Sequence, residues 1–201
     1  DTYTLPSPEM RKAMYNAEVG NDGFREDPTV NKLEEQSAEL FNKESAVFVS
    51  SGIMGNFLSI LAHCKRGDQI IIGDQSHIYT NELGGYASLG GVYPAVIKNE
   101  TDGTMDLNSI IEELDPYEGS DEDIHLAQTN LIALENTHNS CGGKAIDNNY
   151  FNKVQSIASN KKIPIHLDGA RIFNACIALE TSDLSEIIKN LKPSDKITIS
   201  N

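Results

Sequence analysis

The strongest constraint on the fold is a set of short segments in which apolar residues follow one another without polar alternation. Such segments span residues 69–72, 130–134 and 163–167. A strand with one solvated face alternates apolar and polar residues, whereas a strand buried on both faces does not. Segments with apolar residues at helical spacing, such as 107–114 and 150–159, lie between them. The pattern predicts an α/β fold with three layers, in which helices cover both faces of a mostly parallel sheet.

The remaining elements follow from the same two patterns. Asp27-Pro28-Thr29 has the composition of a helix start, with a capping residue followed by Pro in the first turn. Helical spacing predicts helices over 8–17, 28–41, 54–62 and 80–89. Apolar runs predict strands over 46–49, 91–98 and 197–201.

Charge and cysteine content narrow the classes of partner. The 201 residues include 16 Lys and Arg against 30 Asp and Glu, a formal charge of −14. This charge repels nucleic acids and anionic membranes, so neither is expected as a partner, and no apolar run reaches the length of a bilayer span. Cys64, Cys141 and Cys176 are too few and too widely spaced for a disulfide framework or a closed zinc site. We therefore expect a reducing, cytoplasmic location.

An acidic segment stands apart from the rest of the chain. Residues 99–125 hold ten acidic residues and no Lys or Arg, and the loop 115–123 is the most acidic part. A charge run of this kind is typical of a solvated loop. Calcium binding is the alternative, but the spacing lacks the ligand ladder of an EF-hand.

Two polar turns at predicted strand ends are candidates for ligand binding. The run from Ser51 to Asn56 is a turn of small residues that opens a helix, and the free backbone N–H groups at a helix start can bind phosphate. No Gly-Lys-Ser/Thr follows, which argues against an ATPase or GTPase. His77 comes soon after the strand at 69–72, where a catalytic and a structural role are both open.

The strand at 163–167 ends in the most informative residues. Asp168 follows it directly, and Arg171 comes three positions later. A buried carboxylate is costly unless it meets a cation, and the protonated ring nitrogen of pyridoxal phosphate (PLP) is such a cation. The Arg171 guanidinium could hold a carboxylate or the phenolic oxygen of the cofactor. Two alternatives are an Asp–Arg pair that only fixes a loop and a metal-binding module built from His138, Cys141 and His166.

Taken together, the chain resembles the low-specificity L-threonine aldolases, which are fold-type I PLP enzymes. The matching runs are Pro8–Met14, Glu26–Thr29, Ser51–Asn56, Ser76–Ile78, Glu135–Asn139 and Asp168–Asn174. The resemblance implies an N-terminal segment over 1–20 and the PLP-binding large domain over 21–201. It also implies that the Schiff-base lysine and the small C-terminal domain lie beyond Asn201, so that this fragment alone would be inactive.

The resemblance implies cofactor contacts for five residues. Gly52 and Ile53 would offer backbone amides to the phosphate, although the family usually has Thr where Ile53 stands. His77 would stack on the ring and handle the substrate hydroxyl. Asp168 would hold the ring nitrogen, and Arg171 would bind the ring oxygen or the substrate carboxylate. The catalytic residues would thus be His77, Asp168 and Arg171, with no metal.

The resemblance also implies the reaction. Thr4, Glu82 and Arg171 would line the substrate pocket, and the enzyme would be a lyase that cleaves L-threonine or L-allo-threonine to glycine and acetaldehyde. Its sites would lie between the subunits of a homotetramer. Alternatives are a β-eliminating lyase, an aminotransferase, a non-catalytic fragment that binds the cofactor weakly, or a structural partner in a hetero-oligomer. Lys196 would lie at the wrong end of its strand for catalysis and is expected to be a surface lysine.

Overall fold

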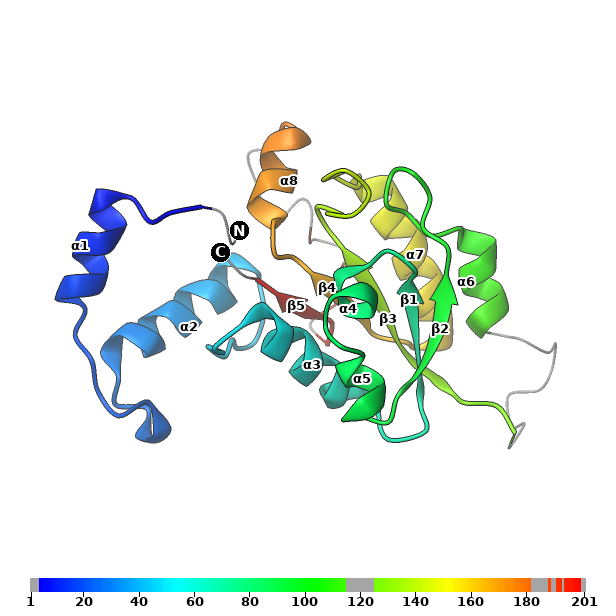
Figure 1. The fold of residues 1–201 in the computed structure, drawn as a ribbon, viewed down its shortest axis with the longest axis horizontal. Coiled ribbons are helices and arrows are strands. Elements are labelled where there is room, and N and C mark those ends of the chain that lie inside the picture. The colour runs from blue at the N-terminus through cyan, green and yellow to red at the C-terminus, as the bar shows by residue number, and fades with distance from the viewer. Residues whose placement is uncertain (1–3, 115–124, 182–187, 189–190, 193, 200–201) are drawn as a thin grey trace.

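The sheet is fully parallel, as the apolar runs predict. The computed structural model describes residues 4–114, 125–181, 188, 191–192 and 194–199. Five strands pair in the order β2-β1-β3-β4-β5 (Figure 1). The strands are β1 (Gln69–Gly73), β2 (Tyr93–Ile97), β3 (Thr129–Glu135), β4 (Ile165–Asp168) and β5 (Lys196–Thr198).

Helices cover both faces of this sheet, which confirms the three-layer α/β prediction. Alternate residues of β1 point to opposite faces, so Ile71 packs in one hydrophobic cluster and Ile70 and Ile72 in another. The cluster around Ile71 contains side chains from α6 (Leu107–Leu114), α7 (Asn148–Lys161) and α8 (Ile172–Ala178). The other contains side chains from α3 (Gly52–His63), α4 (His77–Thr80) and α5 (Gly85–Ser88). Figure 1 shows α4 and α5 on the opposite side of the sheet from α7.

The N-terminal helices lie beside the sheet rather than on it. Figure 1 places α1 (Pro8–Asn16) and α2 (Pro28–Leu40) beyond β5, joined through the short 3-10 helix η1 (Asp22–Phe24). The predicted cap is confirmed, because Asp27 Oδ1 accepts hydrogen bonds from the amides of Thr29 and Val30. Neither helix contains a buried residue. Their apolar side chains therefore remain available to another surface.

Two predicted elements are wrong, and the short helices η1 and α8 were not predicted. Residues 46–49 form no strand, and Val47 and Phe48 are exposed; the Phe48 amide donates to Glu34 Oε1 instead of to a sheet neighbour. The predicted helix over 80–89 is divided between α4 and α5, because Leu83 and Gly84 adopt left-handed backbone conformations that interrupt it.

Two other expectations concern the acidic loop and membrane association. The loop 115–123 lies outside the described residues. Within the described part of the chain, none of the helices combines the length and the apolar character that a bilayer crossing demands.

Candidate active site

The candidate site lies at the carboxyl edge of the sheet, where the strand order reverses. From β1 the chain passes to β2 on one side and then returns to form β3 on the other side of β1. Ligands of open parallel sheets bind at such a switch point, beyond the carboxyl ends of the strands. His77 follows β1, while Glu135 and Asp168 are the last residues of β3 and β4. The topology thus brings three titratable groups to one edge.

Asp168 is a buried carboxylate with two hydrogen-bond donors. Its side chain is 4% exposed, Oδ1 accepts from the Ala170 amide at 3.2 Å, and Oδ2 accepts from Asn56 Nδ2 at 2.9 Å. Burial, reinforced by the nearby carboxylate of Glu135, raises the pKa of Asp168 to about 6. A cation placed next to Asp168 would reverse this shift. The site therefore favours a positively charged group at this position.

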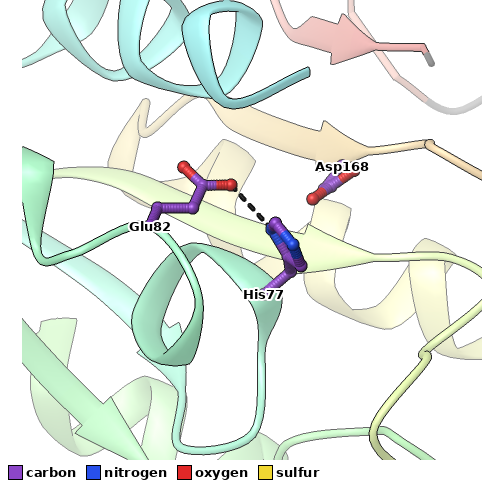
Figure 2. Close-up of side chains that lie close together, drawn as sticks. All are labelled: His77, Glu82 and Asp168. Atoms are coloured by element: carbon purple, nitrogen blue, oxygen red, sulfur yellow. Dashed lines mark hydrogen bonds and ion pairs between the residues drawn. The ribbon is translucent and has the colours of Figure 1, made fainter. Parts of the chain in front are cut away.

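His77 and Glu82 form an ion pair beside Asp168 (Figure 2). The His77 Nδ1 atom lies 2.9 Å from Glu82 Oε1, and the His77 amide donates to Glu135 Oε2 at 2.8 Å. The hydrogen bond to Glu82 raises the pKa of His77 against the opposing effect of burial. Donor or acceptor atoms of His77, Glu82 and Asp168 all lie within 4.8 Å of one another. Glu82, which was expected to line the substrate pocket, is therefore a close partner of both predicted catalytic residues.

Three further residues complete this group but were not predicted for the PLP site, although His166 was a candidate ligand of the alternative metal module. Asn56 Nδ2 donates to Glu82 Oε1 at 2.8 Å as well as to Asp168, and Asn56 Oδ1 lies 2.9 Å from His166 Nε2. Glu135 accepts from the amides of His77 and Asn139. We call Asn56, His77, Glu82, Glu135, His166 and Asp168 the carboxyl-edge cluster. The sequence held a signal for His166, since it lies two residues before Asp168 and so shares its face of β4.

The start of α3 presents free backbone amides next to this cluster, a feature that can bind an anion. The Ser51 hydroxyl caps the helix by accepting a hydrogen bond from the Met54 amide. The amides of Gly52 and Ile53 lie in the first turn, where backbone N–H groups have no carbonyl partner within the helix. Asn56 comes four positions after Gly52, which corresponds to about 6 Å along a helix axis. Because Asn56 touches Asp168, the helix start lies within the reach of a ligand that carries both an anionic arm and a cationic ring.

The residues present fit a cofactor of that description. Asp168, Glu82 and Glu135 place three carboxyl groups around the single imidazole of His77. A cationic ring would relieve this excess of buried negative charge, and the first turn of α3 would complement a phosphate. Both features are properties of the chain itself, so the predicted PLP site is consistent with the geometry.

Other predicted residues lie outside the cluster. Arg171 is half-buried and immediately precedes α8, while Thr4 is exposed ahead of α1; their predicted roles stay predictions. Lys196 is exposed at the amino end of β5, as expected of a surface lysine.

The alternative metal module is wrong for the described residues. His138, Cys141 and His166 do not form a group of converging side chains; the group that converges is His77, Glu82 and Asp168. His166 is instead hydrogen-bonded to Asn56, and His138 is buried with no partner for either ring nitrogen.

A separate cleft lies beside the start of α3. It has a volume of about 430 Å³ and is lined mainly by apolar side chains of α3, α4 and α5. Ser51, Ile53 and Glu82 line it, whereas His77 and Asp168 do not. The cleft therefore adjoins the candidate site and shares Ile53 and Glu82 with it, but does not contain His77 or Asp168.

Comparisons with known proteins agree with this geometry. The sequence profile described as beta-eliminating lyase matches residues 1–201. The chain is 48% identical over 180 residues to the probable low-specificity L-threonine aldolase 2 of Arabidopsis thaliana, covering 89% of this chain and 50% of that protein. It is 42% identical over 178 residues to the low specificity L-threonine aldolase of Escherichia coli K12, covering 89% and 51%. The solved structure of Leishmania major threonine aldolase superposes with a TM-score of 0.75 at 19% identity, covering 94% of this chain and 54% of that one.

Proposed function

Since the chain belongs to the beta-eliminating lyase family, we propose that it forms the cofactor-binding part of a PLP-dependent aldolase. The substrate would be L-threonine or L-allo-threonine, and the products glycine and acetaldehyde. The chain spans about half the length of the curated relatives it matches. The observation that carries the proposal is the buried Asp168 carboxylate next to His77, within reach of the helix start at Gly52.

Each residue of the site would have a defined task toward the cofactor. Asp168 would hold the ring nitrogen, and the Gly52 and Ile53 amides would bind the phosphate. When bound, PLP supplies an electron sink for the bonds at the substrate Cα atom. Asp168 would keep the ring nitrogen protonated, because a carboxylate in a site that excludes water interacts strongly with a cation. The domain limits 1–20 and 21–201 belong to the same proposal.

His77 would act on the substrate hydroxyl. Its Nδ1 atom is occupied by Glu82, so Nε2 is the ring nitrogen that could take a proton from the hydroxyl of threonine. Glu82 would orient this imidazole and stabilise its protonated form. Arg171 would bind the substrate carboxylate or the ring oxygen of the cofactor, and Thr4 would complete the substrate pocket.

Incubation of the protein of complete natural sequence with PLP and L-threonine tests the reaction. We expect stoichiometric glycine and acetaldehyde, and a loss of at least about 100-fold in turnover for Asp168→Ala. Asp102→Ala is a matched control, because Asp102 is exposed and accepts hydrogen bonds from the amide and hydroxyl of Thr104 in its own turn. Bound PLP without acetaldehyde release would refute the aldolase assignment.

The alternatives within the same fold give different products. A β-eliminating lyase would release ammonia and a 2-oxo acid, and an aminotransferase would need a 2-oxo acid as second substrate. The family description alone is compatible with elimination. The names of the relatives in Arabidopsis and Escherichia coli favour the aldolase.

We further propose that the protein assembles as a homotetramer in the cytoplasm. The first three helices expose large apolar side chains, including Met14 and Tyr15 on α1 and Leu58 on α3. Leu83 is 99% exposed at the rim of the cleft, where a second copy of the chain could cover it. Cys64, Cys141 and Cys176 form no disulfide with one another, which supports a reducing compartment. Analytical ultracentrifugation of the protein of complete natural sequence tests the assembly, and a monomer at micromolar concentration would refute it.

A further inference from the structure

Asn56 is the central member of the carboxyl-edge cluster. Its amide group contacts Glu82, Asp168 and His166, at 2.8, 2.9 and 2.9 Å. Asp168 and His166 belong to β4, Glu82 lies between α4 and α5, and Asn56 itself is 2% exposed on α3. One side chain thus links α3 with the end of β4 and with the segment between α4 and α5.

The partners determine how the amide is oriented. An ionised carboxylate can only accept hydrogen bonds, so the NH₂ group of Asn56 must face Glu82 and Asp168. The Asn56 oxygen then faces His166 Nε2, which must carry a hydrogen. His166 is fully buried, and burial lowers its pKa to about 3, so it remains neutral at physiological pH. A neutral imidazole with its hydrogen on Nε2 is a constant donor to Asn56.

The two hydrogens of Asn56 lie between groups that repel each other. Among the described residues, Glu135 at the end of β3, Glu82 ahead of α5 and His77 on α4 interact electrostatically with Asp168. Like charges in a buried site disfavour joint ionisation, whereas a donated hydrogen bond favours the ionised form. Glu82 Oε1 accepts from Asn56 and also contacts His77, so the same amide fixes the carboxylate that orients the imidazole.

We propose that Asn56, oriented by His166, is a positioning residue that keeps Asp168 ionised beside Glu82 and aims the two side chains at the cofactor ring and at His77. This inference rests on the proposed function, but its test does not require a bound cofactor. Without the amide, Asp168 would retain a proton at neutral pH and would no longer pair with a cationic ring.

The proton affinity of Asp168 is the direct measure of this role. The protein of complete natural sequence, freed of cofactor, is labelled with ¹³Cγ-aspartate and titrated by NMR, and the Asp168 signal is assigned by its absence in Asp168→Asn. Asn56→Leu removes both donated hydrogens at similar volume. We expect the proton affinity of Asp168 to rise at least about tenfold, because a hydrogen bond to a charged group is lost. PLP affinity is followed by quenching of tyrosine fluorescence. As the pH is lowered, the affinity of Asn56→Leu should decline at a higher pH than that of the wild-type protein, because Asp168 becomes protonated earlier.

A second variant and a control separate positioning from general destabilisation. His166→Phe keeps a ring in the core but removes the donor to Asn56. It should also raise the proton affinity of Asp168, by a smaller factor than Asn56→Leu. If Asn56→Leu does not fold, His166→Phe provides the test in its place. Gln155→Leu removes another buried amide, on α7, whose Nε2 donates to Ser159. This control should leave the Asp168 titration unchanged.

The outcomes distinguish this inference from the proposed function. An unchanged Asp168 titration in folded Asn56→Leu, or in His166→Phe where that variant replaces it, would overturn the role of Asn56. That result together with normal PLP binding would leave the proposed function intact. Conversely, a wild-type protein that binds no PLP would refute the cofactor assignment, while the NMR titration would still report on Asn56.

Discussion

The interior of the sheet and its carboxyl edge are equally buried but differ in what burial does to stability. Ile71 and Ile132, paired across β1 and β3, are 0% exposed, and each contributes free energy of folding by removing apolar surface from water. Asp168 is 4% exposed, and its burial disfavours the charged form. Burial in the interior thus stabilises the folded protein, whereas burial of Asp168 at the edge destabilises it when the carboxylate is charged. This difference is typical of a site that is preserved for ligand chemistry.

The largest expected effect is in the interior. Ile132→Ala should lower the free energy of unfolding by about 2–5 kcal/mol, because it removes buried methyl groups and leaves a cavity between closely packed layers. Urea denaturation at pH 7 measures the loss. Ile111→Ala is the matched control, since Ile111 is 46% exposed on α6 and should lose less than about 1 kcal/mol. Equal losses at the two positions would contradict the distinction between interior and surface.

The free energy of unfolding should fall as the pH rises through the range in which Asp168 titrates. A carboxylate whose pKa is lowered by folding has the opposite effect. The pKa of Asp168 is raised from 3.8 to about 6, so its contribution to stability is present below pH 3.8 and is lost as the pH rises through 6. The expected loss is about 3 kcal/mol. Urea denaturation from pH 3.5 to 8 tests this on the cofactor-free protein, with Asp168→Asn as reference to remove the titration of other acids. A difference between the two proteins that stays constant with pH would contradict the assignment.

A steric test probes the contact between the helix that carries Asn56 and the sheet. A Cβ atom on Gly55 would lie 2.7 Å from Thr198 Cγ2 of β5, so Gly55→Ala must displace α3, the strand or the Thr198 side chain. We expect a loss of about 1–3 kcal/mol in the free energy of unfolding. Gly85→Ala in α5 is the control, because its added Cβ meets no atom within 4 Å. Helix propensity favours Ala over Gly at both positions, so a loss in the control as large as that in Gly55→Ala would contradict the contact with Thr198 as the cause.

The sequence predicts the interior well because its signal is local. Residues 70–72 are all isoleucine, and burial on both faces of a parallel sheet is the structure in which that composition is stable. Residues 46–49 are likewise all apolar but form no strand, because strand formation also needs a neighbouring strand with free backbone groups. The division of the helix over 80–89 depends on backbone conformations at Leu83 and Gly84 that spacing does not reveal.

The candidate site was predicted in part for a related reason. His77 and Asp168 follow predicted strands, so topology alone brings them to one edge. Asn56 lies one turn inside a helix, and its contact with Asp168 spans 112 positions of sequence. Such a contact depends on how α3 docks against the sheet, and that docking is a tertiary property. The fold and the ends of its strands were therefore accessible, whereas the hydrogen bonds between them were not.

The smallest expected effect concerns the wrongly predicted strand and sharpens the same contrast. Val47 is 72% exposed, so Val47→Ser should change the free energy of unfolding of this chain by less than about 0.5 kcal/mol. Val154→Ser, in which a fully buried valine of α7 is replaced, should lose more than about 2 kcal/mol in the same urea titration. A large loss at Val47 in the protein of complete natural sequence, but not in residues 1–201 alone, would mean that another surface covers residues 46–49. A large loss in both would contradict the exposed position of this segment.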